Sequence, residues 1–413
     1  MKPHLWLLLP LLAAGASADL TQPNKTAFEA PPVLSATQLL GPDAAGPCYR
    51  VREPVPTDGY MAHFSIDSDF GRFECIGLPQ TRTRIREMAA LQKLVTVSKS
   101  DLFADGVKRS IEQPIAAVKN IAKDPVGAAK AAPKTVGHFF QKIGKSIGDA
   151  ASNVQDRINK GDDSDMGADA SRAAKGVIGF ESEKLECAKQ LGVDPYSDNA
   201  RLQQEIENVS WVFYAGSLPL RVGAAVASGG ASMALTATKM VGLPEEIYAL
   251  TPAELTLRNQ QTLKAMGVAA AVAKKFAANP ALSLTQRCSI LRSLQALGNL
   301  KGRATVIGVA ADCDTRRQVG FLDQALVLLA RHPQAAARFT SLEVLGRLPA
   351  AVDAHGLLVI PAPVDYLSWT AEVAEFAHRD DLLGRKPALI LTGEASARAR
   401  AELARLGWSV VSQ

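Results

Sequence analysis

Residues 387–411 read PALILTGEASARARAELARLGWSVV and carry the clearest fold signal in the chain. Pro387–Thr392 is a short apolar run, Glu394–Leu406 has helical spacing, and Trp408–Val411 is a second apolar run. This pattern predicts a strand, a helix and a strand, with a spacing that suits a crossover between two parallel strands. We therefore expect a mixed α/β domain over residues 301–413.

Upstream in the same domain, the apolar pattern changes between helical and strand spacing. Thr315–Arg331 and Trp369–His378 have helical periodicity, whereas Ala304–Ala311 fits either a strand or a buried helix. Phe339–Leu348 and Gly356–Pro361 predict a hairpin around the turn residues between them.

The central part of the chain, residues 168–300, is predicted to be a helical domain. Helical stripes cover Ser171–Leu191 and Ala200–Ala215. Thr251-Pro-Ala-Glu254 is a capping box that predicts a helix to Met266, and Ser283–Gln286 precedes a further helix over Leu284–Leu297.

Residues 47–100 predict a small β-meander followed by one helix. Cys48–Val55, Tyr60–Asp67 and Phe70–Leu78 alternate between apolar and polar residues, and from Thr81 the period becomes helical. Residues 19–46 are rich in Pro, Ala and Gly and predict a loose lead-in. The expected fold class is thus α+β and predominantly helical, with an N-terminal β-meander, a central helical domain and a mixed α/β C-terminal domain.

The first eighteen residues have the pattern of a secretory signal peptide. A short basic start precedes the apolar run Leu5–Ala14, and Ala16-Ser-Ala18 is a cleavage site of small residues. The apolar run is too short for a membrane span, which needs about 20 residues. We expect cleavage after Ala18 and a periplasmic or secreted location.

Five cysteines remain in the exported chain, and none forms a C-x-x-C motif. The odd number leaves at least one thiol unpaired. Because Cys48 and Cys75 both lie on predicted strands of the meander, and small exported units often depend on disulfides, we predict a disulfide between them.

Residues 101–167 form a basic amphipathic segment. Between Lys93 and Lys160 there are twelve Lys and Arg residues against six Asp and Glu. Pro114-Ile-Ala-Ala-Val-Lys119 recurs eleven residues later, and this repeat keeps one helical face apolar. The segment could bind an anionic membrane surface or an envelope protein, or pack on the protein's own helices; no nucleic acid is expected. The candidate contact residues are Lys119, Lys123, Lys130, Lys134, Phe139, Phe140, Lys142 and Lys145.

The most apolar internal stretch is Val222–Thr238, which is rich in Ala, Gly, Ser and Thr and poor in Leu and Ile. Small side chains let helices pack closely, so we expect a buried helical hairpin. Two alternatives are a flexible loop at Gly229-Gly230 and insertion of the hairpin into a bilayer, which would indicate a secreted, toxin-like protein.

Signals for catalysis are weak, and no cofactor or metal ligand set is predicted. One G-x-S-x-G occurs at Gly144–Gly148, inside the basic repeat and without the strand that a nucleophile elbow needs. Asp365 follows a predicted strand, where α/β proteins often place a site, but the preferred interpretation is that it caps the next helix and that Trp369 packs on the hairpin. Gly393 opens the last helix and could present amides to an anion, although a tight turn is the simpler interpretation. A hydrolase with its site in this domain is therefore one alternative.

Residues 191–199, LGVDPYSDN, and their surroundings resemble a group of exported proteobacterial proteins of unknown function. The resemblance implies export but no activity and no site residue. The leading hypothesis is a non-enzymatic periplasmic or secreted protein that contacts a membrane surface or an envelope partner.

Overall fold

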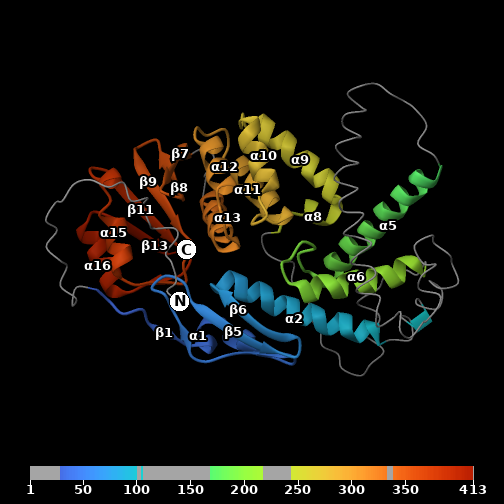
Figure 1. The fold of residues 1–413 in the computed structure, drawn as a ribbon. Helices are drawn as coiled ribbons and strands as arrows, with labels where there is room; N and C mark the ends of the chain where they lie inside the picture. The colour runs from blue at the N-terminus through green and yellow to red at the C-terminus, as the bar shows by residue number, and fades with distance from the viewer. Residues whose placement is uncertain (1–27, 100–103, 106–167, 217–242, 333–337, 413) are drawn as a thin grey trace. The chain divides into compact units, whose positions relative to one another are not determined.

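The computed structural model describes residues 28–99, 104–105, 168–216, 243–332 and 338–412 (Figure 1). The chain divides into two compact units. The first, here called the sheet unit, contains residues 1–85 and 256–413, and the second, the helical unit, contains residues 86–255. The described elements combine many helices with an N-terminal sheet and a C-terminal mixed sheet, so the expected α+β class is confirmed.

The N-terminal part of the sheet unit is the predicted antiparallel meander. Phe64 and Ile66 alternate with polar residues along the central strand and are almost fully buried. Four strands pair in the order β2-β3-β5-β6. They are β2 (Ala45–Gly46), β3 (Tyr49–Val51), β5 (His63–Ser68) and β6 (Gly71–Ile76).

Part of the expected lead-in is regular structure. Within residues 28–46 the chain forms β1 (Val33–Leu34), which pairs with β4 (Val55–Pro56), then the helix α1 (Ala36–Leu40) and the 3-10 turn η2 (Gly41–Ala44). The Glu53 carboxylate caps α1 by accepting hydrogen bonds from the first two amides of the helix, at 2.8 and 3.0 Å. The prediction of a loose segment was wrong here, since α1 is capped both by Ser35, which accepts from the Gln38 amide, and by Glu53, 17 residues from the helix start.

The predicted disulfide between Cys48 and Cys75 is also wrong. Both side chains are buried and neither is part of a disulfide. Cys75 lies opposite Phe64, whereas the carbonyl of Cys48 accepts from the amide of Asp69. These two positions are five residues apart along the hairpin, or about 16 Å at ~3.3 Å per residue. A disulfide needs Cα atoms within about 7 Å, so this register forbids it.

The C-terminal part of the sheet unit is a five-stranded mixed sheet in the order β13-β11-β9-β8-β7. The strands β9, β11 and β13 are parallel, which confirms the predicted strand–helix–strand unit around α16 (Ala397–Arg405). The expected single hairpin is corrected to a three-stranded meander, because a turn at Gly346, with φ of 65°, adds a strand. The strands are β7 (Phe339–Leu345), β8 (Leu348–Asp353), β9 (Leu357–Ala362), β11 (Lys386–Leu391) and β13 (Ser409–Ser412).

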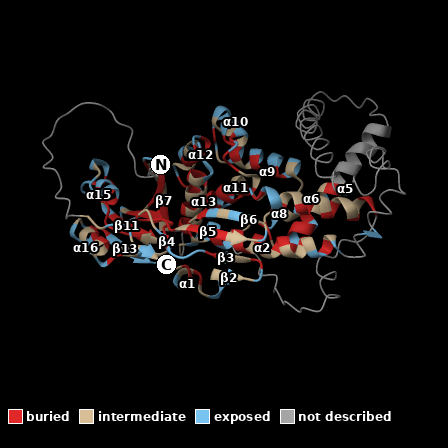
Figure 2. Cartoon of the chain, turned by 60° about the horizontal axis from the view of Figure 1, so that its bottom comes forward, coloured by how far each residue is buried: buried red, intermediate tan, exposed pale blue. Residues whose placement is uncertain are grey.

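Helices on both sides of residue 300 share one hydrophobic core with this sheet. The ambiguous stretch at 304–311 is helical, and capping boxes begin two of the helices, at Ser283 and Thr315. Figure 2 shows that buried residues gather on the sheet and on the inner faces of these helices. The helices are α9 (Pro252–Ala265), α10 (Ala270–Ala278), α11 (Leu284–Ala296), α12 (Arg303–Ala311) and α13 (Arg316–Arg331).

The helical unit is built around two packed helices, α5 (Ala168–Leu191) and α6 (Ala200–Ala215), and a short helix α8 (Glu246–Ala249) (Figure 1). Asn199 caps α6, and its side-chain amide also donates to the buried carboxylate of Glu87 at 3.0 Å. Among the described residues, no helix is both long enough and apolar enough to cross a membrane. The stretch Val222–Thr238 lies outside the described residues.

Candidate functional site

The edge at the carboxyl ends of the parallel strands β9 and β11 is where an α/β fold most often binds a ligand. Here that edge is formed by residues 363–370 and 392–396. They include the short parallel pair β10 (Tyr366–Leu367) and β12 (Glu394–Ala395), and lead into α15 (Ala371–Ala377) and α16. The polar residues expected at this edge are Asp365 and those around Gly393.

Asp365 is buried and binds the N-terminal part of the sheet unit. Its Oδ2 accepts a hydrogen bond from the Ala62 amide at 2.9 Å, and its Oδ1 accepts from the Leu78 amide at 3.0 Å. Leu78 is the first residue of α2 (Leu78–Ser98), so Asp365 caps that helix and not α15, which Thr370 caps. Burial raises the pKa of Asp365, while the two amides act in the opposite direction.

The rest of this edge is occupied by the same N-terminal part of the chain. The Tyr60 carbonyl accepts from the Asp365 amide at 2.9 Å, and the Gly59 carbonyl accepts from the Ser368 amide at 2.8 Å. The Glu29 carboxylate accepts from the Trp369 amide and from the Ser396 hydroxyl, each at 2.6 Å. The edge is therefore closed by the protein's own backbone and side chains.

Gly393 lies at a tight crossing of two backbone segments. A Cβ at this position would lie 2.1 Å from the Asp365 carbonyl oxygen and 2.7 Å from that of Val364. The Thr392 hydroxyl donates to the same Val364 carbonyl at 2.8 Å. The site thus matches the tight-turn interpretation, because the glycine permits the approach that pairs β10 with β12.

A second polar cluster, centred on Asp58, links the meander to α13. The Asp58 carboxylate accepts from the Met61 amide at 2.8 Å and binds His63 Nε2 at 3.0 Å and Arg317 Nη2 at 2.7 Å. Burial alone would raise the pKa of Asp58, but hydrogen bonds from His63, Met61 and Arg317 outweigh it and hold that pKa below its ordinary value. Neither Asp58 nor His63 was predicted as a site residue from the sequence, because Arg317 lies 259 residues away from Asp58 along the chain.

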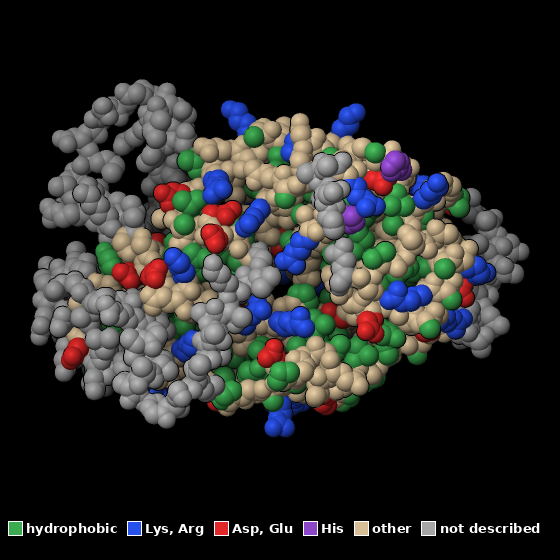
Figure 3. Space-filling view, turned by 180° about the vertical axis from the view of Figure 1, so that it is seen from behind, with side chains coloured by type: hydrophobic (Ala, Val, Ile, Leu, Met, Phe, Trp, Pro, Cys, Tyr) green, Lys and Arg blue, Asp and Glu red, His purple; other side chains and the backbone are tan. Residues whose placement is uncertain are grey.

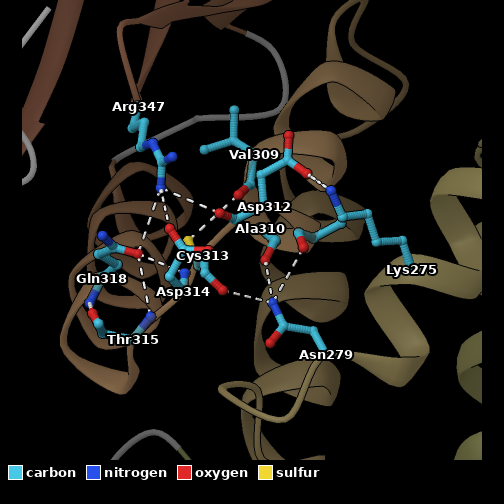
Figure 4. Close-up of polar contacts among 11 residues, drawn as sticks. Lys275, Asn279, Val309, Ala310, Asp312, Cys313, Asp314, Thr315, Gln318 and Arg347 are labelled. Atoms are coloured by element: carbon cyan, nitrogen blue, oxygen red, sulfur yellow. Dashed lines mark hydrogen bonds and ion pairs between the residues drawn. The ribbon is translucent and has the colours of Figure 1, made fainter. Parts of the chain in front are cut away.

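A third network closes the C-terminal end of α12 (Figure 4). The side-chain amide of Asn279 donates to the carbonyls of Ala310, Ala311 and Cys313, at 3.3, 3.2 and 2.8 Å. Arg347 donates to the Asp312 carbonyl at 3.2 Å. Burial raises the pKa of the Cys313 thiol to about 11, so it is protonated at neutral pH and unsuited to nucleophilic attack. This network caps a helix.

Asp323, on α13, is a further buried acid. Its Oδ1 is shielded from solvent and has no hydrogen-bond partner among the described residues, whereas the side chain does bond to Ser289 on α11. Burial raises the pKa of Asp323 from 3.8 to about 7, against the effect of the Ser289 hydrogen bond.

We predict that Asp323→Asn stabilises the protein at alkaline pH. Protonation of Asp323 contributes to the unfolding free energy. This contribution is fully present below pH 3.8, the ordinary pKa, and is lost as the pH rises through about 7. The unfolding free energy of the variant should therefore exceed that of the natural protein by about 2–3 kcal/mol more at pH 8 than at pH 5. Urea unfolding at both pH values tests this, and a difference that does not change with pH would contradict it.

Two hollows differ in size and lining. The sheet unit has an apolar cavity of about 50 Å³ beside Phe376 and Trp408, which is small for a ligand. The helical unit has a cleft of about 400 Å³, lined by α5, α6 and the turn at residues 195–197. Within the part of the chain that the structure describes, no three His, Cys, Asp or Glu side chains are grouped to hold a metal ion.

The sequence-predicted contact residues of the basic segment all lie in 106–167, outside the described residues, as does the G-x-S-x-G at Gly144–Gly148. Comparisons with protein families, with curated proteins and with solved structures found no match. What can be said of function therefore rests on the chain's own residues.

Proposed function

We propose that the chain is an exported, non-enzymatic interaction protein of the cell envelope, which binds an anionic membrane surface through its basic segment. The observation that carries this proposal is the closed edge of the C-terminal sheet. Both carboxylate oxygens of Asp365 are used by backbone amides, and Glu29, Gly59 and Tyr60 take the neighbouring donors. This occupation argues against a hydrolase that acts at this edge.

The charge distribution supports the membrane part of the proposal. Residues 93–160 have a net charge of +6, and the whole chain has a net charge of +5, so the remainder is close to neutral. On the face shown in Figure 3, the described Lys and Arg side chains are interspersed with Asp and Glu. A basic segment with apolar residues at helical spacing is attracted to anionic lipid by about 1 kcal/mol per basic residue near the surface.

We predict that the mature chain cosediments with phosphatidylglycerol vesicles at low salt, and much less with phosphatidylcholine vesicles or at high salt. Replacing Lys119 and Lys123 with glutamine should weaken binding roughly thirtyfold, because two favourable charges worth about 1 kcal/mol each are removed. The paired control replaces Lys264 and Lys274, which are exposed in the sheet unit. Equal binding of both variants, or no binding at low salt, would contradict the proposal. If the chain captured an envelope protein but did not bind lipid, that protein and not the membrane would be the partner of the basic segment.

A further inference from the structure

The cleft of the helical unit has the size of a binding site and a lining that is partly apolar and partly polar. Its volume of about 400 Å³ falls in the range of roughly 300–1,000 Å³ found for ligand pockets. Leu185 on α5 and Ile206 on α6 line it together with Pro195 and Pro252. These side chains offer an apolar surface to a small ligand.

Two oppositely charged side chains lie on the same lining. Glu181 and Lys184 are three residues apart on α5, and the distance from Lys184 Nζ to Glu181 Oε1 is 3.7 Å, longer than a hydrogen bond. Each side chain is 22% exposed. Glu207 on α6 is within electrostatic range of both, since Lys184 lowers its pKa and Glu181 raises it, although burial is the larger effect and raises that pKa overall. Lys184 is thus placed among two carboxylates and remains accessible.

An independent observation concerns Gln203, which also lines the cleft. Its Nε2 is shielded from solvent and has no hydrogen-bond partner in the described part of the chain. A shielded donor without an acceptor is unfavourable, and an acceptor oxygen on a ligand would satisfy it after a rotation of the amide.

We propose that this cleft binds a short zwitterionic peptide with apolar side chains. The ligand ammonium would pair with Glu181, and its carboxylate with Lys184 and the amide of Gln203. The apolar side chains would pack on Leu185 and Ile206. A simple anion would meet Glu181 and a simple cation would meet Lys184, whereas a zwitterion satisfies both signs of charge.

The test is calorimetric titration of the mature chain with leucyl-leucine, its N-acetylated form and its C-terminal amide. The unmodified dipeptide should bind, and loss of either charge should weaken binding at least tenfold, since hydrogen bonds to charged groups contribute about 1.5–3 kcal/mol. Lys184→Met should reduce binding of the unmodified dipeptide at least tenfold, and Gln203→Leu by roughly fivefold. Lys189→Met, an exposed lysine on the same helix, is the matched control and should leave binding unchanged.

Circular dichroism melting of each variant checks that the helical unit remains folded. No binding of the dipeptide at millimolar concentration would overturn the proposal, as would equal binding of the capped peptides. Equal weakening by Lys184→Met and Lys189→Met would place the ligand elsewhere and would also overturn it. None of these outcomes depends on membrane binding, so the two proposals fail or stand separately.

Discussion

Asp365→Ala is expected to lower the free energy of unfolding by about 3–5 kcal/mol. The substitution leaves the amides of Ala62 and Leu78 without an acceptor in a buried place, and each such group costs about 1–3 kcal/mol. The bond to Leu78 is also the cap at the start of α2, so its loss should fray the first turn of that helix. Guanidinium unfolding measures the change, and hydrogen exchange should show that the amides of Ala62 and Leu78 lose protection.

The matched control is Asp381→Ala. Asp381 forms an exposed ion pair with Arg379, its side chain is 47% exposed, and such pairs contribute about 0–1 kcal/mol. If Asp365→Ala cost no more than this control, Asp365 would be free to serve a ligand, and the closed-edge interpretation behind the proposed function would fail. Normal stability combined with a lost catalytic activity would favour the hydrolase alternative.

Gly393→Ala is expected to destabilise the sheet unit by about 3 kcal/mol or more. The added Cβ would lie 2.1 Å from the carbonyl oxygen of Asp365 and 2.6 Å from its carbon. Both atoms belong to the backbone, so no side-chain rotation relieves the clash, and overpacking of this kind costs at least the usual ~1–3 kcal/mol. The pairing of β10 with β12 should be lost first.

Gly320→Ala provides the control for the same substitution. Gly320 lies in α13, and an added Cβ there would meet no atom within 4 Å. Alanine should stabilise this helical position by about 0.5–1 kcal/mol. Thermal unfolding should therefore move in opposite directions for the two variants. If Gly393→Ala unfolded like the natural protein, the close crossing would be absent and an anion-binding turn would become the better interpretation.

The variants Asp365→Ala and Gly393→Ala also test whether vesicle binding depends on the stability of the sheet unit. Asp365→Ala removes contacts between the C-terminal sheet and the N-terminal part of the sheet unit, and Gly393→Ala disturbs the crossing between β10 and β12; both positions lie outside residues 101–167. If membrane binding belongs to residues 101–167 alone, vesicle binding should survive in any variant that still folds. A parallel loss of stability and vesicle binding would show that the membrane contact needs the folded sheet unit.

Elements defined by local patterns were predicted well from the sequence. The capping box of Ser283 and Gln286 and the cap at Asn199 mark helices that begin where expected. The alternation at Phe64 and Ile66 correctly predicted a strand with one buried face. Such signals succeed because a cap or an alternating strand depends on residues within a few positions of one another.

The candidate site was predicted less well. Asp365 was singled out because it follows a strand, but its partners lie 303 and 287 residues away, and nothing near it in the sequence indicates them. Cys48 and Cys75 were assigned to the correct small sheet, yet their pairing depended on the strand register, and the register separates them. A pattern of alternation identifies the buried face of a strand but not which position on the next strand it meets.

The sequence by itself determined the helices and strands with local signals, the parallel strand–helix–strand unit at residues 387–411 and the concentration of positive charge before Lys160. Only the tertiary structure decided that Asp365 caps a helix of the N-terminal segment, that Gly393 permits a backbone crossing and that Asp58 joins His63 to Arg317. The physical reason is that each of these side chains is satisfied by groups that become neighbours only when distant segments fold together. The roles of Asp365, Gly393 and Asp58 therefore follow from the topology of the sheet unit, whereas local helix caps and hydrophobic periodicity follow from neighbouring residues in the sequence.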